Sequence, residues 1–269
     1  MRSVTLSEKE SIESLFEGSI YQNSHLGWLG LWDLYAADGS VWIDTFRHGN
    51  FLIGLQPCAD TILWLHSFYA DKIPGEYPLA HKIKDLLPPG RYSVYTISSH
   101  SWYNKLLENN SFHKCDEIVE LETTEINLPI RNVPDGSYSF TYSLSDSVID
   151  SCETVFPPLW RMNTAEADRA KETSSYKLAV ISNRQITGCL LADFADGNCH
   201  IQRISVFPAY QNRGAASFMI RQMVKDAKEK GITSFSVNTN RNNTTALHFY
   251  EHLNFSIQGK RYPVYYRYI

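Results

Sequence analysis

The stretch "SVFPAYQNRGAASFMI", residues 205–220, runs from an apolar segment through a loop of small residues into a segment with helical spacing. The apolar residues after the loop recur with the period of an α-helix, at Met219, Ile220, Met223, Val224 and Ala227. A helix is therefore expected from Ala216, and Gly231 stands where its C-terminus is expected. The loop thus connects a predicted strand to a predicted helix.

This loop contains Gln211 and Arg213, followed by the small residues Gly214, Ala215 and Ala216. One explanation is packing, since a tight strand-to-helix connection needs a glycine. The other is anion binding, because the first N–H groups of a helix have no partner inside the helix and the helix dipole places partial positive charge there. Small residues let a phosphate approach those donors, and Arg213 can add a charge-assisted hydrogen bond. The loop by itself does not decide between the two.

Length and composition limit the class of protein. The 269 residues suffice for one large domain or two of ordinary size, and 43% of them are hydrophobic, enough for real cores. A formal net charge of −4, without a block of lysine or arginine, argues against a nucleic-acid or membrane partner. The N-terminus lacks the apolar core of a signal peptide, and no apolar run approaches the length of a membrane span. We therefore expect a cytoplasmic protein.

The cysteines and histidines do not form a metal motif. Five cysteines without a C-x-x-C pair favour reduced thiols. His113 lies near Cys115, and Cys199 precedes His200, but neither pair has the four-ligand spacing of a zinc site. No metal is expected.

Two halves are separated by a segment with two prolines and an Asp-Gly pair, so residues 123–135 are expected to be a linker between residues 1–122 and 136–269. The second half begins with a strand and a mainly helical region that Pro157 and Pro158 interrupt. Turn signals at Asn183-Arg184 and Gly197-Asn198 then divide a β-rich region into a three-stranded meander. The elements expected after the meander are the loop helix, a strand at 234–239, a helix at 245–253 and a strand at 262–269.

The first half repeats this order of elements. Ser7 with Glu10 predicts a capping box at the start of its first helix. The elements expected next are strands at 41–46, 51–56 and 61–68, a helix at 78–87, a strand at 91–97, a helix at 101–108 and a strand at 117–122. Two copies of one layout, about 130 residues apart, indicate an internal duplication.

The second half resembles the GNAT superfamily of acetyl-CoA-dependent N-acetyltransferases over residues 136–269. The family's Q/R-x-x-G-x-G/A loop after the fourth strand is matched by Gln211, Gly214 and Ala216. Its second signature, an Asn three residues before an Ala and seven before a Tyr, is matched by Asn243, Ala246 and Tyr250, and "LNF" follows. Asn254 stands where glycine is usual in that ending, and asparagine tolerates the left-handed conformation.

The resemblance implies a fold, a co-substrate and a set of site residues. The fold would be α/β (α+β), with two tandem GNAT (acyl-CoA N-acyltransferase) domains, each a mixed, mostly antiparallel sheet flanked by helices. Acetyl-CoA would bind with its pyrophosphate on the loop and its pantetheine arm along the fourth strand. The implied cofactor-binding residues are Ile204, Ser205, Val206, Phe207, Gln211, Asn212, Arg213, Gly214, Ala215, Ala216, Ser217, Asn243, Ala246 and Phe249.

Tyr250 is the implied catalytic residue, a general acid that protonates the leaving thiolate. Its alternative is a core aromatic, since it lies on the apolar face of its helix. Asn243, which the resemblance assigns to the amides of the pantetheine arm, has the alternative of a simple helix cap.

The general base is missing from the places where the family often has a glutamate. Gln202 and Asn238 occupy those places, and neither can accept a proton from an ammonium group. His200, Asp193 and the C-terminal carboxylate of Ile269 are the candidates to replace it, and the sequence selects none of them. His200 also has the alternative of an ordinary strand histidine.

The first half, residues 1–122, is interpreted as a degenerate GNAT-like domain that does not bind acetyl-CoA, similar in layout to tandem members such as mycothiol synthase. Pro74 and Pro78 have no N–H to offer an anion, and Glu76 would place negative charge beside a phosphate. The segment 98–117 echoes the second signature with Tyr103, Leu106 and Phe112. The aromatic-rich residues 25–42 are expected either in the core or lining a substrate cleft.

The expected function is that of an acyltransferase (EC 2.3.1 class) that moves an acetyl group to a small-molecule amine or a peptide N-terminus by direct attack. The first alternative is a CoA-binding protein that has lost the chemistry, and the second is a structural duplication in which neither half binds CoA. The chain is expected to be a monomer or a homodimer.

Overall fold

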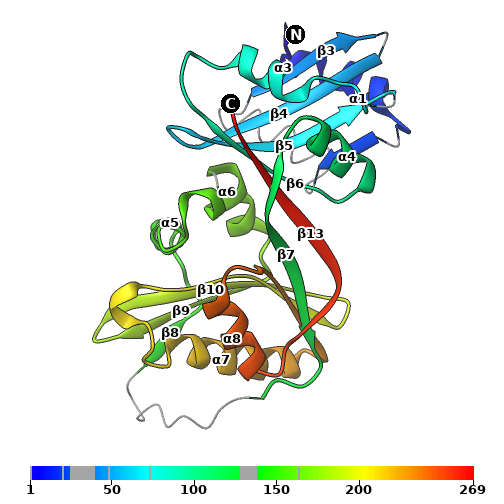
Figure 1. The fold of residues 1–269 in the computed structure, drawn as a ribbon. Helices are drawn as coiled ribbons and strands as arrows, with labels where there is room; N and C mark the ends of the chain where they lie inside the picture. The colour runs from blue at the N-terminus through cyan, green and yellow to red at the C-terminus, as the bar shows by residue number, and fades with distance from the viewer. Residues whose placement is uncertain are drawn as a thin grey trace. The chain divides into compact units, whose positions relative to one another are not determined.

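The chain folds into two compact units, described by a computed structural model over residues 2–19, 21–24, 40–47, 49–72, 74–127, 138–162 and 164–269 (Figure 1). Unit 1 consists of Met1–Glu117 with Tyr262–Ile269, and unit 2 of Ile118–Arg261. These units differ from the expected ranges, because residues 118–122 belong to unit 2 and residues 262–269 to unit 1. Most of the expected linker, and residues 25–39 of the aromatic-rich segment, lie outside the described residues.

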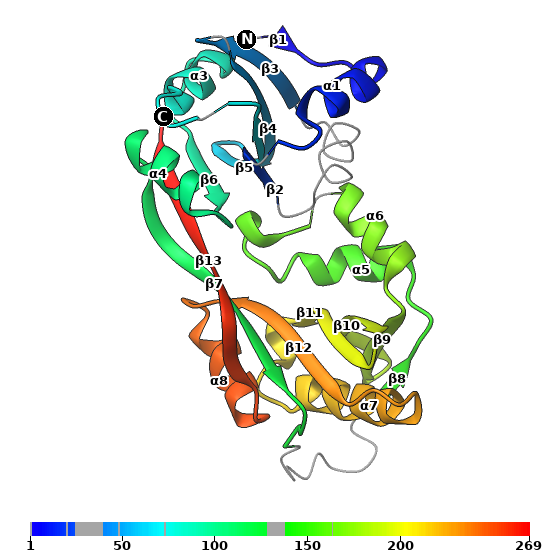
Figure 2. The same ribbon diagram turned by 90° about the vertical axis from the view of Figure 1, so that its right-hand side faces the viewer.

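Unit 2 has one mixed sheet with the strand order β7-β12-β11-β10-β9-β8, in which only β11 and β12 pair in parallel. Figure 2 shows α7 and α8 on one face of this sheet and α5 and α6 on the other. In chain order its elements are β7 (His113–Thr123, shared with unit 1), β8 (Ser139–Thr141), α5 (Asp146–Glu153), α6 (Thr164–Thr173), β9 (Tyr176–Ser182), β10 (Gln185–Ala195), β11 (Asn198–Val206), α7 (Ala215–Glu229), β12 (Ser234–Asn240) and α8 (Thr244–His252).

The expected meander is confirmed as β9, β10 and β11. Its first turn is the expected one, since both Asn183 and Arg184 have a positive φ, as a two-residue hairpin turn requires. The second turn lies one residue earlier than expected, because Asp196 and Gly197 carry its positive φ angles. The predicted helix end is also correct, because α7 ends at Glu229 and Gly231 has a φ of 75°.

The core of unit 2 lies on the sheet face that α7 and α8 cover. Successive residues of a strand point to opposite faces, so every second residue of each strand contributes to this core. Its fully buried members include Leu121, Ile201, Phe235, Met219, Ile220, Met223 and Leu253. The opposite face of the same strands carries the polar residues that matter for the site.

Unit 1 has the same layout, with the strand order β1-β3-β4-β5-β6-β13 and a parallel pair formed by β5 and β6. Its elements are β1 (Arg2–Ser3), α1 (Lys9–Phe16), β2 (Tyr21–Ser24), β3 (Ser40–Phe46), β4 (Gly49–Ala59), β5 (Ile62–Ala70), α3 (Leu79–Leu86), β6 (Ser93–Ile97), α4 (Ser101–Asn109) and the end of β13 (Ser256–Tyr268). One core cluster combines α3 and α4 with one sheet face, and a second combines α1 with the other. The expected capping box of the first helical segment is wrong by two residues, since Thr5 and Glu8 form it.

The two halves of the chain exchange a strand. The strand that follows α4, β7, pairs through residues 118–123 with β12 and so completes the sheet of unit 2. The strand that follows α8, β13, pairs through residues 264–268 with β6 and so completes the sheet of unit 1. Each unit therefore includes in its sheet a strand segment that the other half of the chain supplies.

Candidate active site

Gly214 initiates α7 in a left-handed conformation, with φ of 90° and ψ of 1°. A residue with a side chain would lose about 1–2 kcal/mol in this conformation. The backbone conformation alone therefore explains why the loop has a glycine at this position. The preceding turn also needs a positive φ, 60°, at Asn212. These two residues turn the chain from β11 into α7 within a few residues.

The first turn of α7 presents unpaired N–H groups. Phe218 N–H is the first to donate to the helix, to Gly214 O at 2.9 Å. The N–H groups of Ala215, Ala216 and Ser217 have no acceptor within the described part of the chain. Together with the dipole of a 15-residue helix, they form a positive, donor-rich surface at the loop.

Two side chains of the loop have distinct surroundings. Gln211 donates through Nε2 to Val206 O at 2.9 Å, which ties the loop to the end of β11. Arg213 is exposed, and its backbone carbonyl accepts a hydrogen bond of 2.9 Å from the Tyr138 hydroxyl. Its guanidinium makes no ion pair among the residues that the structure describes, and it can turn toward an anion at the start of α7.

A fork opens in the sheet beside this loop. Strands β11 and β12 pair over four positions only, from Asn198 with Ser234 to Ile201 with Val237. Beyond Ile201, the register with β10 shifts at Gln202, and β11 then pairs with β10 from Arg203 to Val206. Strand β12 continues to Asn240 in register with β7. Past this point, one edge of each strand is open within the described structure.

The open edge of β11 carries main-chain donors and acceptors. Successive peptide groups of a strand alternate between its two edges. Phe207 N–H donates to Thr187 O of β10 at 2.9 Å, so the peptide groups of Val206 and Ile204 face the fork, where Val206 O already accepts from Gln211 Nε2. An extended ligand can pair with them as an added strand would.

Tyr250 lies in α8, 4% exposed, between the rings of Phe249 and Phe255 at centroid distances of 5.3 and 5.5 Å. Burial raises the pKa of its phenol well above the ordinary value, so the hydroxyl is protonated at neutral pH. Within the described residues, that hydroxyl makes no hydrogen bond. Tyr250 is therefore a core aromatic by packing and still holds a proton to donate.

Asn243 caps α8, because its Oδ1 accepts from Ala246 N–H at 3.2 Å. Its Nδ2 donates to nothing within the described residues and is exposed, so the cap leaves one donor for a ligand. Ala246 and Phe249 pack against the core of unit 2 from the same helix. The predicted left-handed residue after α8 is confirmed, with a φ of 70° at Asn254.

Polar side chains gather on the sheet face opposite this core. Gln202 accepts from Ser174 Oγ at 2.8 Å and donates to Asp193 Oδ2, whereas Ser175 N–H donates to Asp193 Oδ1 at 3.2 Å. Both oxygens of Asp193 are thus engaged. Ile269, another candidate base, belongs to unit 1, where its N–H donates to Tyr92 O at 2.9 Å.

Sequence reasoning missed Glu120. This residue of β7 lies directly opposite Asn238 of β12 in the antiparallel register, so the two side chains share a face of the sheet. A carboxylate is thus present beside Asn238, a position where the sequence offers no base. The sequence offered three glutamates within the predicted strand 117–122, with nothing to show that this strand joins the other half.

Comparison with known proteins shows which family and which solved structures this chain resembles. Residues 144–255 match the sequence model of the Acetyltransferase (GNAT) family. The second half of this chain is a GNAT domain. No curated protein sequence gives a significant match.

Three similar solved structures show the fold of the whole chain. A tandem GNAT protein from the clavulanic acid biosynthesis pathway has a TM-score of 0.56 and 8% identity, over 97% of this chain and 95% of that one. A GCN5-related N-acetyltransferase from Sphaerobacter thermophilus has a TM-score of 0.57 and 13% identity, over 82% of this chain and 76% of that one. A GCN5-related glucosamine N-acetyltransferase region of a fungal multi-domain GH3 β-N-acetylglucosaminidase has a TM-score of 0.65 and 10% identity, over 99% of this chain and 38% of that one. The predicted fold class, two tandem GNAT domains, is confirmed.

The first GNAT unit differs from the second at its own fork. Strands β5 and β6 pair in parallel from Ile62 with Ser93 to Trp64 with Tyr95, and the rest of β5 would offer an open edge. Strand β2 covers that edge, pairing from Tyr21 with Ala70 to Ser24 with Ser67. The fork of unit 1 therefore contains a strand of the chain itself.

Asn23 anchors this strand. Its side chain, in a residue 2% exposed, donates to Ile97 O at 2.9 Å and accepts from Ser99 N–H at 3.1 Å. One residue of β2 thus links the edge of β5 to the end of β6. The side chain of Asn23 thus bridges the two strands of the fork, β5 and β6.

The helix start of unit 1 is also occupied. Leu79 N–H donates to Tyr77 O at 2.8 Å, and Ala80 N–H donates to Asn110 Oδ1 at 3.1 Å. Pro78, the residue before α3, has no N–H to offer. At the start of α7, by contrast, the corresponding N–H groups are unpaired within the described residues.

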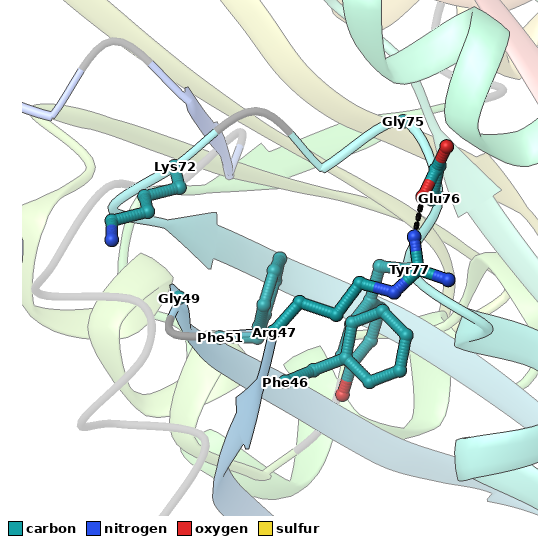
Figure 3. Close-up of a pocket in the computed structure, with 8 residues that line it drawn as sticks. All are labelled: Phe46, Arg47, Gly49, Phe51, Lys72, Gly75, Glu76 and Tyr77. Carbon is teal, nitrogen blue, oxygen red and sulfur yellow. Dashed lines mark ion pairs between the residues drawn. The ribbon is translucent and has the colours of Figure 1, made fainter.

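A cavity of about 260 Å³ lies beside this loop of unit 1 (Figure 3). Glu76 forms an ion pair with Arg47 there, so the charge of each is offset by the other. Tyr77 fills the base, stacked on Phe51 at a centroid distance of 4.0 Å. Tyr103, which echoes Tyr250 in the sequence, is fully buried with its hydroxyl 3.3 Å from Thr96 Oγ1. Neither the loop nor the tyrosine of unit 1 is open to a ligand.

Three further findings concern the described residues alone. They contain no helix long and apolar enough to cross a membrane. They contain no group of three or more His, Cys, Asp or Glu side chains that could hold a metal ion. The five cysteines are free thiols.

Proposed function

We propose that this protein is an N-acetyltransferase that binds one acetyl-CoA per chain in unit 2 and transfers the acetyl group to an amine. The observation that carries the proposal is the joint presence of unpaired N–H groups at the start of α7 and an open edge of β11 beside them. The first suits the pyrophosphate of CoA, and the second suits the amides of its pantetheine arm. The match to the GNAT family supports acetyl-CoA as the co-substrate.

Different residues of unit 2 would bind different parts of acetyl-CoA. Ala215, Ala216 and Ser217 would donate to the pyrophosphate, with Arg213 adding charge. The peptide groups of Ile204 and Val206 would pair with the pantetheine arm, and Asn243 Nδ2 would donate to one of its carbonyls. When bound, acetyl-CoA supplies an activated thioester carbonyl at the fork.

Tyr250 would then act as the general acid. Its phenol, kept protonated by burial, gives its proton to the sulfur as the C–S bond breaks. A strand N–H at the fork would meet the negative charge that develops on the carbonyl oxygen. Holding amine and thioester in one place supplies much of the rate.

Unit 1 would not bind acetyl-CoA. Its equivalent edge is covered by β2, and its equivalent helix start is bonded to Tyr77 and Asn110. We therefore expect one binding site per chain.

Calorimetric titration of acetyl-CoA tests the site. We expect one site per chain in the wild-type protein and none in Gly214→Glu, because the new carboxylate would lie among the phosphate donors. The matched control is Gly75→Glu in the corresponding loop of unit 1, where an added Cβ meets nothing within 4 Å and binding should be unchanged. Thermal unfolding of both variants shows whether they fold. Binding that survives in Gly214→Glu would mean that the phosphate site lies elsewhere.

Tyr250→Phe separates an enzyme from a CoA-binding protein without chemistry. Removal of the hydroxyl should lower kcat by about 10²–10⁴-fold, as expected for a lost general acid, and leave the affinity for acetyl-CoA unchanged. A set of primary amines that gives no release of free CoA from the wild-type protein, despite tight binding, would favour the sensor or regulatory alternative.

A further inference from the structure

His200 occupies the centre of the polar face of unit 2, one position before the fork. It lies on β11 next to Ile201, the last residue that pairs with β12. Its Nδ1 is 2.9 Å from Ser236 Oγ, and that hydroxyl also accepts from Asn198 Nδ2 at 3.1 Å. Ser236 therefore orients the ring, and Nε2 makes no hydrogen bond within the described residues.

Two carboxylates lie around this ring on the same face. Asp193 pairs directly with His200 on β10, and Glu120 lies on β7 opposite Asn238. Glu122 shares this face opposite Ser236, but it is exposed. Both raise the pKa of His200, although burial lowers it more, so the net shift is below the ordinary value of 6.5. A ring with this pKa is neutral at pH 7 and can accept a proton.

The two carboxylates are not equivalent. Asp193 already accepts from Ser175 N–H and Gln202 Nε2. Glu120 is half-buried and makes no ion pair or hydrogen bond within the described chain. Burying part of a charge without a partner is unfavourable, so Glu120 suits a site whose partner is a cation.

We propose that Glu120 and His200 form the acceptor site of unit 2, with Glu120 binding a primary amine as its ammonium ion and His200 Nε2 accepting the first proton. This inference rests on the proposed acetyl transfer. In it, β7, the strand that follows α4 of the first half, supplies the carboxylate that β11 and β12 lack. The substrate class is an alkyl amine that is protonated in solution, including a peptide N-terminus.

The protons balance as follows. The ammonium ion gives one proton to His200 Nε2, which later passes it to water. The free amine forms the N–C bond, and the C–S bond breaks as Tyr250 gives its proton to sulfur. The nitrogen then loses its second proton to the Tyr250 oxygen, which restores the phenol and leaves an amide and free CoA.

The kinetic test uses His200→Gln and Glu120→Gln with a set of acceptors comprising an alkylamine, a polyamine and a tripeptide with a free N-terminus. His200→Gln should lower kcat by about 10²–10⁴-fold without changing acetyl-CoA binding. Glu120→Gln should raise the KM for the amine about tenfold and change kcat less. Glu229→Gln is the matched control, since Glu229 is exposed at the end of α7, on the opposite face of the sheet, and should leave both parameters unchanged. Wild-type kcat in His200→Gln would overturn the proposal.

A second measurement does not depend on turnover. Imidazole NMR titration of the protein alone should show a lower pKa for His200 in Glu120→Gln than in the wild type, because a neighbouring negative charge is lost, and no change in Glu229→Gln. An unchanged His200 pKa in Glu120→Gln would overturn the pairing of the two residues. Failure of the proposed function itself is distinguishable, because the wild-type protein would then bind no acetyl-CoA in calorimetry.

Discussion

The side-chain amide of Gln211 donates to the backbone carbonyl of Val206 at 2.9 Å, and so joins the phosphate loop to the strand edge at the fork. Gln211, which matches the first GNAT signature, therefore makes a bond within the chain itself. Its role is to hold the first turn of α7 at a set position relative to the end of β11. Both halves of the proposed CoA site depend on that position.

Gln211→Ala should weaken acetyl-CoA binding without unfolding unit 2. Loss of one hydrogen bond is worth about 0.5–1.5 kcal/mol, which corresponds to roughly a 2- to 12-fold rise in Kd. Calorimetric titration measures the change. Gln258→Ala is the control, because Gln258 is exposed and bonds only to Ser256 within the described residues. Equal Kd values for the two variants would show that the Gln211 bond has no part in binding.

Gly188→Ala should destabilise unit 2 and weaken acetyl-CoA binding. A Cβ at Gly188 would lie 2.3 Å from Ser205 O, a backbone atom, so β11 would have to move away from β10. Overpacking of this kind costs about 1–3 kcal/mol, and the residues displaced include the open edge at Val206. Chemical denaturation and calorimetry report the two effects. At Gly75, where an added Cβ meets nothing within 4 Å, the same substitution should change stability by less than about 0.5 kcal/mol.

Asn23→Ala should destabilise unit 1 and leave acetyl-CoA binding intact. The substitution leaves Ile97 O and Ser99 N–H without their side-chain partner, at a cost of about 1–3 kcal/mol. Hydrogen exchange of β2 and β5 measures the loss, and Asn127→Ala at an exposed position serves as the control. The stoichiometry should stay at one acetyl-CoA per chain. A second molecule bound by Asn23→Ala would mean that β2 alone keeps unit 1 closed.

The activity should rise with pH and then stay constant over the neutral and mildly alkaline range. His200 must be neutral to accept a proton, and burial holds its pKa below 6.5, so kcat is lost as the pH falls below that value. Tyr250 must be protonated to donate, and burial raises its pKa above 10.0, so no alkaline loss is expected below about pH 10. Initial rates at saturating substrate across this range provide the measurement. An acid limb with a midpoint well above pH 7 would contradict the role of His200.

Local sequence signals predicted much of the site. The glycine with small neighbours, the period of the apolar residues and Gly231 together specified α7, because helix start, face and end are all encoded within about fifteen residues. Asn243 and Tyr250 were placed on α8 by their spacing alone. The exclusion of Gln202 as a base follows from its side-chain type, because an amide does not accept a proton from an ammonium group. The capping box of the first helix was misplaced, because Thr5 and Ser7 each precede a glutamate by three residues.

The sequence did not predict which strands pair with each other. Glu120 lies opposite Asn238 although 118 residues separate them, and Asn23 bonds to Ile97 across 74 residues. Strand propensity shows that a segment will pair, but the partner is set by which edge remains free after the rest of the chain has packed.

The amino-acid sequence by itself therefore determined the GNAT layout, the start of α7 among small residues, the position of Tyr250 on α8 and the duplication of the whole. Each depends on residues close together in the chain, whose spacing carries the information. Only the tertiary structure decided that β7 and β13 are exchanged, that β2 covers the fork of unit 1, and that Glu120 stands on the polar face of unit 2. These depend on hydrogen bonds between distant strands, which form wherever an open edge and a matching apolar face meet.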